Sequence, residues 1–470
     1  MNSNRLLTIS CGVLFAAAAV QAETPANPHA AKAREIYAKV ISIPTQEGNA
    51  KVPEMAAYLA QEFRDAGFPP DDIHIVPFKG RTDQTASLVV RYRGNGKGGK
   101  PILLLAHMDV VTANRAEWER DPYQLIEENG FFYGRGTYDD KQGVTALVAT
   151  LLRLKSEKFV PARDLILYLS GDEETEQATT IDIVKNHRAL VDAEYALNAD
   201  AGSGALDDAT GKPLYYAFQT AEKTYADFAV TARNAGGHSS LPRADNAIYD
   251  LAAALQRLAR HRFAVMTNDT TAASLAAAGK ITPGELGTML TRFAANPRDQ
   301  AAAEFLAGQP EYVGQTRTTC VATMLGGGHA QNALPQTATA NVNCRIFPGT
   351  KIEDVRLTLQ KVMEPGVEVT LTGEPMSSDA SPLRKDVVDA VTRAVRRIHP
   401  GIPVVPSQSS GATDSLVFRA AGIPSYGVDG NFMRPKDDFS HGLNERLSVQ
   451  SFYDSLTYWN LLLRDLAGKR

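Results

Sequence analysis

The sequence predicts an α/β domain with a mostly parallel sheet, interrupted by a second and smaller α+β domain. Three short, continuous apolar runs are typical of strands that are buried on both faces of such a sheet. These runs lie at residues 102–106, 165–169 and 195–197. Helical patterns alternate with them, at residues 49–66, 143–156 and 181–187. Alternating strands and helices favour a parallel sheet that is covered by helices.

The second domain is indicated by a change of pattern near residue 221. From there the order is strand, helix, strand, strand, helix, strand, which is the order of a ferredoxin-like unit. The six elements are expected at 225–233, 246–260, 317–325, 337–347, 352–363 and 367–372. An Ala-rich helical stretch at about 270–306 interrupts them, and the first pattern resumes after 375 with a helix at 385–398 and a strand near 425–428. We therefore expect the larger domain at 23–221 and 375–470 and the insert at 222–374.

The composition is that of an ordinary folded protein. Of 470 residues, 44% are hydrophobic and 22% charged, which excludes a wholly disordered or low-complexity chain. The chain has 49 Lys and Arg and 53 Asp and Glu, so it carries no excess of positive charge. Nucleic acid is therefore not an expected partner.

The first 22 residues resemble an export signal. Arg5 precedes an apolar run at 6–20, which is shorter than the roughly 20 residues that span a bilayer. Small residues up to Ala22 suit cleavage there. We expect an exported protein, periplasmic or secreted, with no membrane attachment after cleavage.

Cleavage would leave two cysteines, Cys320 and Cys344. Both lie in strand-like runs, and each is 12 residues from a turn centred near Asn332. Cross-strand neighbours of this kind can form a structural disulfide in an oxidising compartment. The alternative is a pair of buried free thiols.

Acidic and histidine residues follow the predicted strands at the points where the strands end. His107 and Asp109 follow the first strand, Glu173 and Glu174 follow the second, and Asp200 follows the third. The carboxyl ends of parallel strands open into the crevice where α/β sheets bind ligands. An acidic run taken alone is more often a solvated surface, but three such placements together indicate a functional site.

Two further segments add candidates for a metal site. Asp139 lies in a glycine-rich loop at 134–141 that enters a helix, and His441 precedes a glycine turn. The full set of two imidazoles and three carboxylates is His107, Asp139, Glu174, Asp200 and His441. Such donors suit Zn²⁺, with Mn²⁺ or Co²⁺ as substitutes. Five ligands exceed the need of one catalytic zinc and suffice for two ions that share a carboxylate.

Two carboxylates of this region remain for other roles. Asp109 is two residues from His107 and can accept a hydrogen bond from the other ring nitrogen. Glu173 stays free as a base that takes a proton from water and returns it to a leaving amine. The chain contains neither G-x-S-x-G nor H-E-x-x-H, and a G-x-x-x-x-G-K match at 94–100 precedes a strand, as a phosphate loop does not.

Taken in order, five segments resemble the motifs of the M20 metallopeptidases. They are residues 107–111, 134–141, 171–174, 236–240 and 441–442. The resemblance covers nearly all of the mature chain and implies a zinc-peptidase domain with an inserted lid or dimerisation domain. It is strongest to the carboxypeptidase S and N-acyl-amino-acid hydrolase branch. Carboxypeptidase G, aminoacylase and acetylornithine deacetylase are also similar.

The resemblance also implies a role for each metal ligand. Asp139 would bridge two Zn²⁺ ions. His107 and Asp200 would complete the first site. Glu174 and His441 would complete the second.

The remaining roles concern catalysis and substrate binding. By resemblance, Asp109 would orient His107, and Glu173 would be the general base. His238 matches a histidine that, in dimeric members, reaches the active site of a partner subunit and stabilises the oxyanion. A homodimer is therefore an expected assembly.

Three lid and loop elements are similar to the family's substrate-binding positions. Asn332 would help to hold the scissile carbonyl. Arg345 would clamp a substrate carboxylate, for which an arginine fork is well shaped. The loop that contains Gly411 and Thr413 would assist it. The alternative for Arg345 is a surface charge on a strand.

These observations predict an exported di-zinc hydrolase that cleaves an amide bond next to a free carboxylate, in a peptide or an N-acyl amino acid. One alternative is a dipeptidase or aminopeptidase that requires a free substrate amine. Another is a catalytically silent binding protein, but every ligand position and the base are filled. The same site could also run in reverse and join an acyl group to an amino acid.

Overall fold

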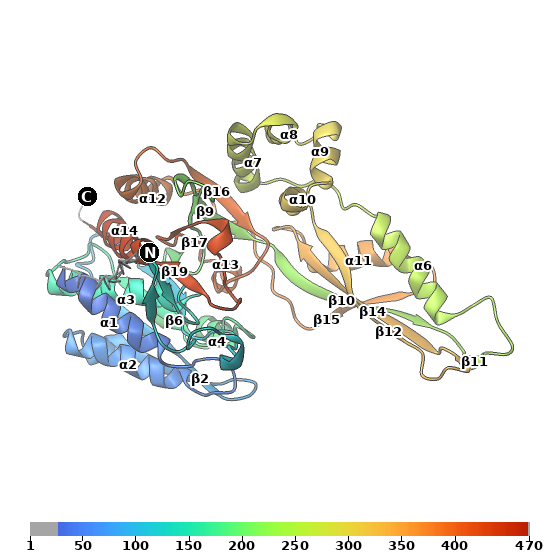
Figure 1. Ribbon diagram of the computed structural model, residues 1–470, viewed down its shortest axis with the longest axis horizontal. Coiled ribbons are helices and arrows are strands. Elements are labelled where there is room, and N and C mark those ends of the chain that lie inside the picture. The colour runs from blue at the N-terminus through green and yellow to red at the C-terminus, as the bar shows by residue number, and fades with distance from the viewer. Residues whose placement is uncertain (1–26, 469–470) are drawn as a thin grey trace, which may run out of the picture.

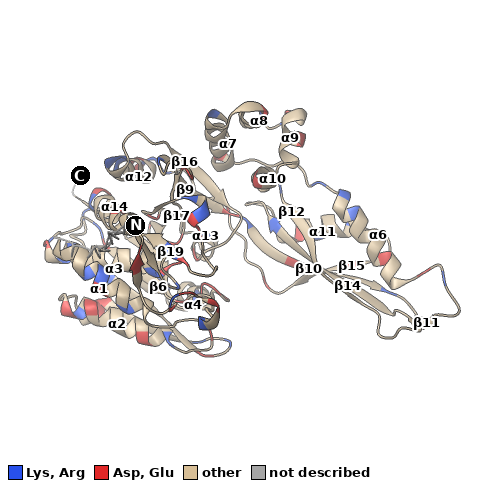
Figure 2. Cartoon of the chain, in the orientation of Figure 1, with Lys and Arg blue, Asp and Glu red and all other residues tan. Residues whose placement is uncertain are grey.

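The computed structural model describes residues 27–468, so the export signal predicted at 1–22 lies outside the described residues. Figure 1 shows a larger part that holds both ends of the described chain and a smaller part formed by the middle of the sequence. Acidic and basic residues are interspersed along both parts (Figure 2). Within residues 27–468, no helix is long and apolar enough to cross a membrane.

The larger part contains a ten-stranded mixed sheet. Its order is β1 (Ile73–Lys79), β2 (Gln84–Tyr92), β6 (Leu165–Ser170), β3 (Ile102–His107), β7 (Tyr195–Asn198), β17 (Ser425–Gly427), β9 (Pro213–Glu222), β8 (Gly204–Leu206) and β18 (Phe432–Met433), with β16 (Val404–Ser409) paired to β9. The central strands β6, β3, β7 and β17 are parallel. β1, β2 and β9 make antiparallel pairs. The three apolar runs are thus confirmed as parallel strands.

Helices cover both faces of this sheet. One face packs against α1 (Pro28–Ile41), α2 (Val52–Asp65), α3 (Lys141–Ser156), α12 (Lys385–Ile398) and α14 (Val449–Ala467). The opposite face packs against α4 (Ala178–Asn186), α5 (Arg188–Val191) and α13 (Ser415–Ala420). Along β3, Leu104 joins the first core, whereas Leu103 and Leu105 join the second. Burial on both faces is why the strand is apolar throughout.

A small antiparallel sheet lies beside the larger one. It consists of β4 (Ile126–Glu128), β5 (Phe131–Tyr133) and β19 (Arg446–Ser448), in the order β19-β5-β4. Its pairing brings the segment that precedes β19 next to the glycine-rich loop that follows β5. These two segments carry His441 and Asp139.

The smaller part has the predicted ferredoxin-like order. Its elements are β10 (Thr224–Arg233), α6 (Ala247–Arg260), β12 (Thr319–Gly327), β14 (Thr337–Ile346), α11 (Ile352–Met363) and β15 (Glu368–Thr372). The antiparallel sheet has the order β12-β14-β10-β15, and α6 and α11 pack on it through a core of their own. We call this smaller part the lid. A two-stranded pair, β11 (Gly237–His238) with β13 (Ala333–Leu334), lies at its far end (Figure 1).

The Ala-rich stretch folds as several short helices. They are α7 (Asp269–Ile281), α8 (Gly284–Ala295), α9 (Gln300–Ala307) and α10 (Pro310–Thr316). Prolines lie at or near the breaks between these helices, namely Pro283, Pro297 and Pro310. Inside a helix, the proline ring would clash with the preceding turn, so the helices end there. The group has its own small core around Leu275, and α7 packs against β16.

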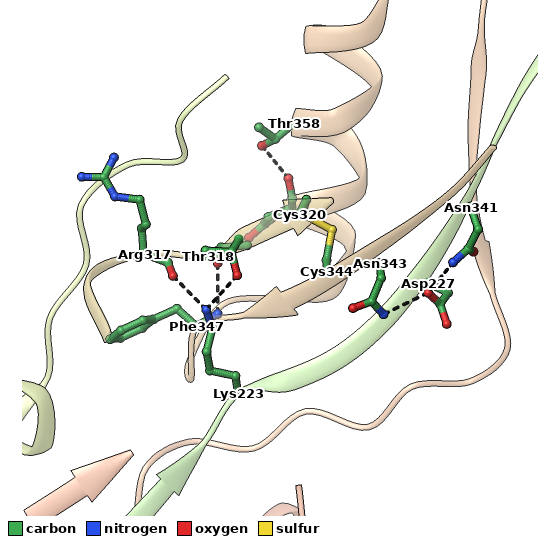
Figure 3. Close-up of a disulfide and its surroundings, with 12 residues drawn as sticks. Lys223, Asp227, Arg317, Thr318, Cys320, Asn341, Asn343, Cys344, Phe347 and Thr358 are labelled. Atoms are coloured by element: carbon green, nitrogen blue, oxygen red, sulfur yellow. Dashed lines mark hydrogen bonds between the residues drawn. A yellow bond between two sulfur atoms is a disulfide. The ribbon is translucent and has the colours of Figure 1, made fainter. Parts of the chain in front are cut away.

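The two cysteines face each other across β12 and β14. The pairing places Cys320 directly opposite Cys344, with Cα atoms 4.1 Å apart and the sulfur atoms bonded at 1.98 Å. Figure 3 shows this disulfide beneath α11. The register slips by one residue between Ala322 and Met324, on the turn side of the cysteine pair, and this slip places Cys320 opposite Cys344.

Candidate metal centre and active site

The parallel register brings the strand-end residues to one edge of the sheet. His107 is the last residue of β3 and lies beside Ser170, the last residue of β6. The 171–174 turn therefore begins next to His107. Asp200 follows β7, which pairs with the other side of β3. The glycine-rich loop before α3 and the loop before β19 supply Asp139 and His441 to the same edge.

The five predicted ligands meet in one cluster with Asp139 in the middle. Asp139 Oδ1 lies 3.0 Å from His107 Nε2, and Asp139 Oδ2 lies 3.1 Å from His441 Nε2. His107 Nε2 is also 3.5 Å from Asp200 Oδ1. His441 Nε2 is 2.9 Å from Glu174 Oε2. Each histidine thus has its own carboxylate, and Asp139 offers one oxygen to each half.

The cluster has the chemistry of a cation site. Burial raises the pKa of Asp200 to about 7, because crowded carboxylates are costly to keep ionised away from water. Glu174 Oε1 is buried and has no hydrogen-bond partner among residues 27–468. Donor atoms of His107, Asp139 and Glu174 lie within 4.8 Å of one another. The residues present therefore fit divalent ions, which would compensate the charge and use the orphaned oxygen.

The neighbouring Asp140 has a different environment. It is 1% exposed, and one of its carboxyl oxygens accepts the backbone N–H of His107 at 3.2 Å. Its donor atoms also fall within reach of His107 and Asp200. Only Asp139, however, contacts both histidines. The geometry therefore places Asp139 between the two histidines, the position that the family resemblance implies for a bridging ligand.

Asp109 contacts both His107 and the turn that carries Glu173 and Glu174. Its main-chain oxygen lies 3.1 Å from His107 Nδ1, whereas its carboxylate is 3.6 Å from that nitrogen. The carboxylate accepts the backbone N–H groups of Glu173 and Glu174 at 3.1 and 3.0 Å. The predicted contact with His107 is thus made chiefly through the backbone. The carboxylate itself fixes the turn that carries the candidate base.

Glu173 lies at the edge of the cluster without joining its ion pairs. Its Oε1 accepts a hydrogen bond from Gln177 Nε2 at 2.8 Å. Burial, followed by the nearby Asp200 charge, raises the pKa of Glu173 well above its ordinary value. A raised pKa makes a carboxylate a better proton acceptor, which suits a group that takes up and releases a proton.

Glu445 is a site residue that sequence reasoning missed. Its carboxylate is fully buried and accepts the backbone N–H groups of Gly136, Tyr138 and Asp139 at 2.7–3.0 Å. Arg135 donates to it at 2.7 Å. Glu445 therefore fixes the loop that presents Asp139, from a position four residues after His441. Its only signal in the sequence is that it belongs to the same segment as His441.

Arg345 lies where the lid meets the larger part. Its guanidinium group donates to the Ser410 carbonyl at 2.9 Å and stacks over the Tyr225 ring at 4.7 Å. It thereby touches the loop that contains Gly411 and Thr413. The sequence-predicted clamp residue and loop are thus neighbours.

His238 and Asn332 are not brought to the metal cluster within one chain. Both are exposed at the β11–β13 end of the lid, which Figure 1 shows far from the larger sheet. They are neighbours there, because the Ser239 N–H donates to the Asn332 carbonyl at 3.0 Å.

The chain matches a known protein family over most of its length. The profile of Peptidase family M20/M25/M40 matches residues 103–465, which span every candidate ligand and the lid. The chain belongs to this family. Similar curated proteins include human N-fatty-acyl-amino acid synthase/hydrolase PM20D1, 29% identical over 77% of this chain and 73% of that protein. A probable succinyl-diaminopimelate desuccinylase of Staphylococcus aureus (strain MSSA476) is 28% identical over 68% of this chain and 72% of that protein.

Solved M20 structures share the whole fold. The M20 family metallo-carboxypeptidase Sso-CP2 from Sulfolobus solfataricus superposes with a TM-score of 0.68. The match covers 93% of this chain and 99% of that one, at 19% sequence identity. The inserted lid is therefore part of the shared M20 architecture. This M20 chain is a metal-dependent hydrolase, and its candidate metal ligands lie at the strand-end cluster.

Proposed function

We propose that this M20 enzyme uses two Zn²⁺ ions to hydrolyse the amide bond of a peptide or N-acyl amino acid beside a free C-terminal carboxylate. The observation that carries the proposal is the position of Asp139 between His107 and His441. A carboxylate shared by two half-sites is what a two-metal centre requires. The substrate class is supported by the human relative named as an N-fatty-acyl-amino acid hydrolase and by a probable carboxypeptidase S-like protein of Dictyostelium discoideum.

The two half-sites divide the ligands as follows. His107 and Asp200 would hold one ion, and Glu174 and His441 the other, with Asp139 common to both. Bound ions would act as Lewis acids toward the substrate carbonyl and would make water more acidic. Co²⁺ and Mn²⁺ suit the same donors.

Glu173 supplies the proton transfer. It lies beside the cluster and is free of an ion pair there, so its carboxylate can take a proton from the attacking water. Gln177 holds one oxygen and leaves the other for this task. The same group then returns the proton to the leaving amine, which must be protonated to depart.

Arg345 and the Gly411–Thr413 loop bind the substrate carboxylate in this proposal. The Arg345 side chain spans from the lid to the loop, so both can contact one anionic group. An amide substrate that ends in a free carboxylate is thereby selected.

Replacing Arg345 by alanine is expected to raise KM for such substrates by about 10- to 100-fold, because a hydrogen bond to a charged group contributes about 1.5–3 kcal/mol. The KM of the matching amidated substrates should change little. Arg233→Ala, at an exposed arginine on β10, is the control. Equal losses on free and amidated substrates would exclude the clamp role.

His238 and Asn332 act between subunits in this proposal. Their exposed position at the lid end suits a homodimer in which each lid reaches the metal cluster of its partner. The His238 imidazole would then donate a hydrogen bond to the oxyanion, and Asn332 would hold the carbonyl. Donors of this kind contribute about 3–4 kcal/mol to catalysis.

We also propose that the enzyme acts outside the cytoplasm. The signal-like segment at 1–22 and the joined Cys320 and Cys344 support export, because disulfides persist in oxidising compartments.

A substrate panel tests the proposed function. Zinc-loaded enzyme is offered matched N-acyl amino acids and dipeptides, with and without free carboxylates and free amines, and products are measured by mass spectrometry. We expect cleavage that requires the carboxylate and tolerates acylation of the amine. Cleavage that requires a free amine would instead assign a dipeptidase or aminopeptidase.

A further inference from the structure

A buried ion pair lies where the larger sheet connects to the lid. Glu222 is the last residue of β9 and is 1% exposed, and Arg419 on α13 is 8% exposed. Arg419 Nη2 donates to Glu222 Oε2. Arg419 also donates to the Ser425 carbonyl at 3.3 Å, which fixes the guanidinium group against β17. The pair is thus held rigidly inside the larger part.

A chain of hydrogen bonds leads from Glu222 to a metal ligand. Thr413 Oγ1 donates to Glu222 Oε1 at 2.7 Å and accepts from Asn198 Nδ2 at 3.0 Å. Asn198 Oδ1 in turn accepts the backbone N–H of Asp200 at 3.0 Å. Because Glu222 can only accept, the Thr413 hydroxyl must point its proton to Glu222. It can then accept from the Asn198 amide nitrogen, which also donates to Ser415 Oγ at 3.0 Å, and these two contacts fix the amide orientation that holds Asp200.

Lys223, the residue after Glu222, forms hydrogen bonds with the lid. Lys223 Nζ donates to the Arg317 carbonyl at 3.0 Å and to Thr319 Oγ1 at 3.2 Å. Figure 3 shows the Lys223 side chain reaching Arg317. Successive side chains of an extended chain point in opposite directions. Glu222 is therefore anchored in the larger part, and Lys223 is anchored in the lid.

We propose that Glu222, held by Arg419, is a positioning residue for the reaction. It orients the Thr413 loop that receives the substrate carboxylate and, through Asn198, the backbone of Asp200. Glu222 lies where the lid joins the larger part. One residue therefore positions both the proposed carboxylate-binding loop and the metal site that contains Asp200. The assignment of Thr413 and Asp200 rests on the proposed function.

The test removes the pair without leaving a buried charge. The double variant Glu222→Leu/Arg419→Met replaces both partners by apolar groups of similar size, and leucine cannot accept the Thr413 hydroxyl. The control, Arg163→Met/Glu194→Leu, removes a partly buried pair that lies before β7, at the end opposite to Asn198. Glu194 is also contacted there by Arg384. Zinc affinity is measured by competition with a chromophoric chelator. KM and kcat are measured on a free-carboxylate substrate and its amide, and Tm is recorded for each protein.

We expect the double variant to lose about 10- to 100-fold in affinity for one zinc ion, as is typical for outer contacts of metal ligands. KM for the free-carboxylate substrate should rise more than KM for the amide, and Tm should fall no further than in the control. Asn198→Ala breaks the same chain without touching the ion pair, so it should also weaken zinc binding. It remains informative if the double variant does not fold.

Wild-type zinc affinity and KM in both the Glu222 double variant and Asn198→Ala would overturn the positioning role. A fall in Tm alone, matched by the control, would also overturn it, because that result is structural. Wild-type protein that binds zinc but cleaves nothing would contradict the proposed function. The zinc titration would still decide the role of Glu222.

Discussion

Glu173→Ala should lower kcat by about 10²–10⁴-fold, the usual contribution of a positioned acid–base group. Zinc content and Tm should stay close to wild type, because the Glu173 carboxylate makes no ion pair with the cluster and accepts only from Gln177 within the described residues. KM should change little, since the proposed function assigns the substrate carboxylate to Arg345. Initial rates at saturating substrate, with metal content measured by mass spectrometry, check this.

Glu176→Ala is the matched control for this result. Glu176 lies three residues further along the same turn, and its partner within the described residues is Arg81, at 3.9 Å on the surface. It should retain wild-type kcat. Glu173→Gln keeps the shape and the contact with Gln177 but cannot carry the proton, so it should resemble the alanine variant. Wild-type turnover in either Glu173 variant would mean that another group is the base.

The strand-end ligands could be predicted because they depend on simple sheet geometry. Continuous apolar runs identified β3, β6 and β7, and parallel strands end at one edge of a sheet. The observed register pairs His107 with Ser170 and Leu105 with Asn198. Residues that follow these strands therefore had to be neighbours. Asp139 and His441 were candidates only by residue type and glycine context, since no periodic pattern brings their loops to that edge. Their assignment as ligands of two ions, with Asp139 shared, came from the family resemblance.

Other parts depend on contacts that a sequence pattern does not encode. Glu445 and Glu222 appear in the sequence as single acidic residues in polar segments, and only the folded chain shows that both are buried and hydrogen-bonded. The edge strand β1, its neighbour β2 and the connecting strand β9 were also missed. β1 and β9 have mixed burial, which weakens the apolar signal. β2 is mostly buried, but Thr85, Ser87 and Arg91 interrupt its apolar residues. The prolines that divide the Ala-rich stretch were visible, but the composition favoured one helical region.

Asp139→Asn should remove the enzyme's activity almost completely, by about 10³-fold or more, and should weaken both zinc sites together. The reason is the shared contact: Asp139 Oδ1 faces His107 and Oδ2 faces His441. An amide offers one oxygen and one N–H₂ group, so one half of the site would meet a donor where it needs an acceptor. The lost negative charge weakens the other half as well.

The bridging role is distinguished from a simple ligand role by counting ions. His441→Gln removes a ligand from one half-site only, so it should retain about one tightly bound zinc ion per chain. Asp139→Asn should retain less than one at the same free zinc concentration. Zinc should raise the Tm of the wild-type enzyme, because ligand that binds only the folded state stabilises it. That rise should be reduced in His441→Gln and nearly absent in Asp139→Asn. Equal zinc content in the two variants would show that Asp139 serves one ion and that the shared-carboxylate arrangement is wrong.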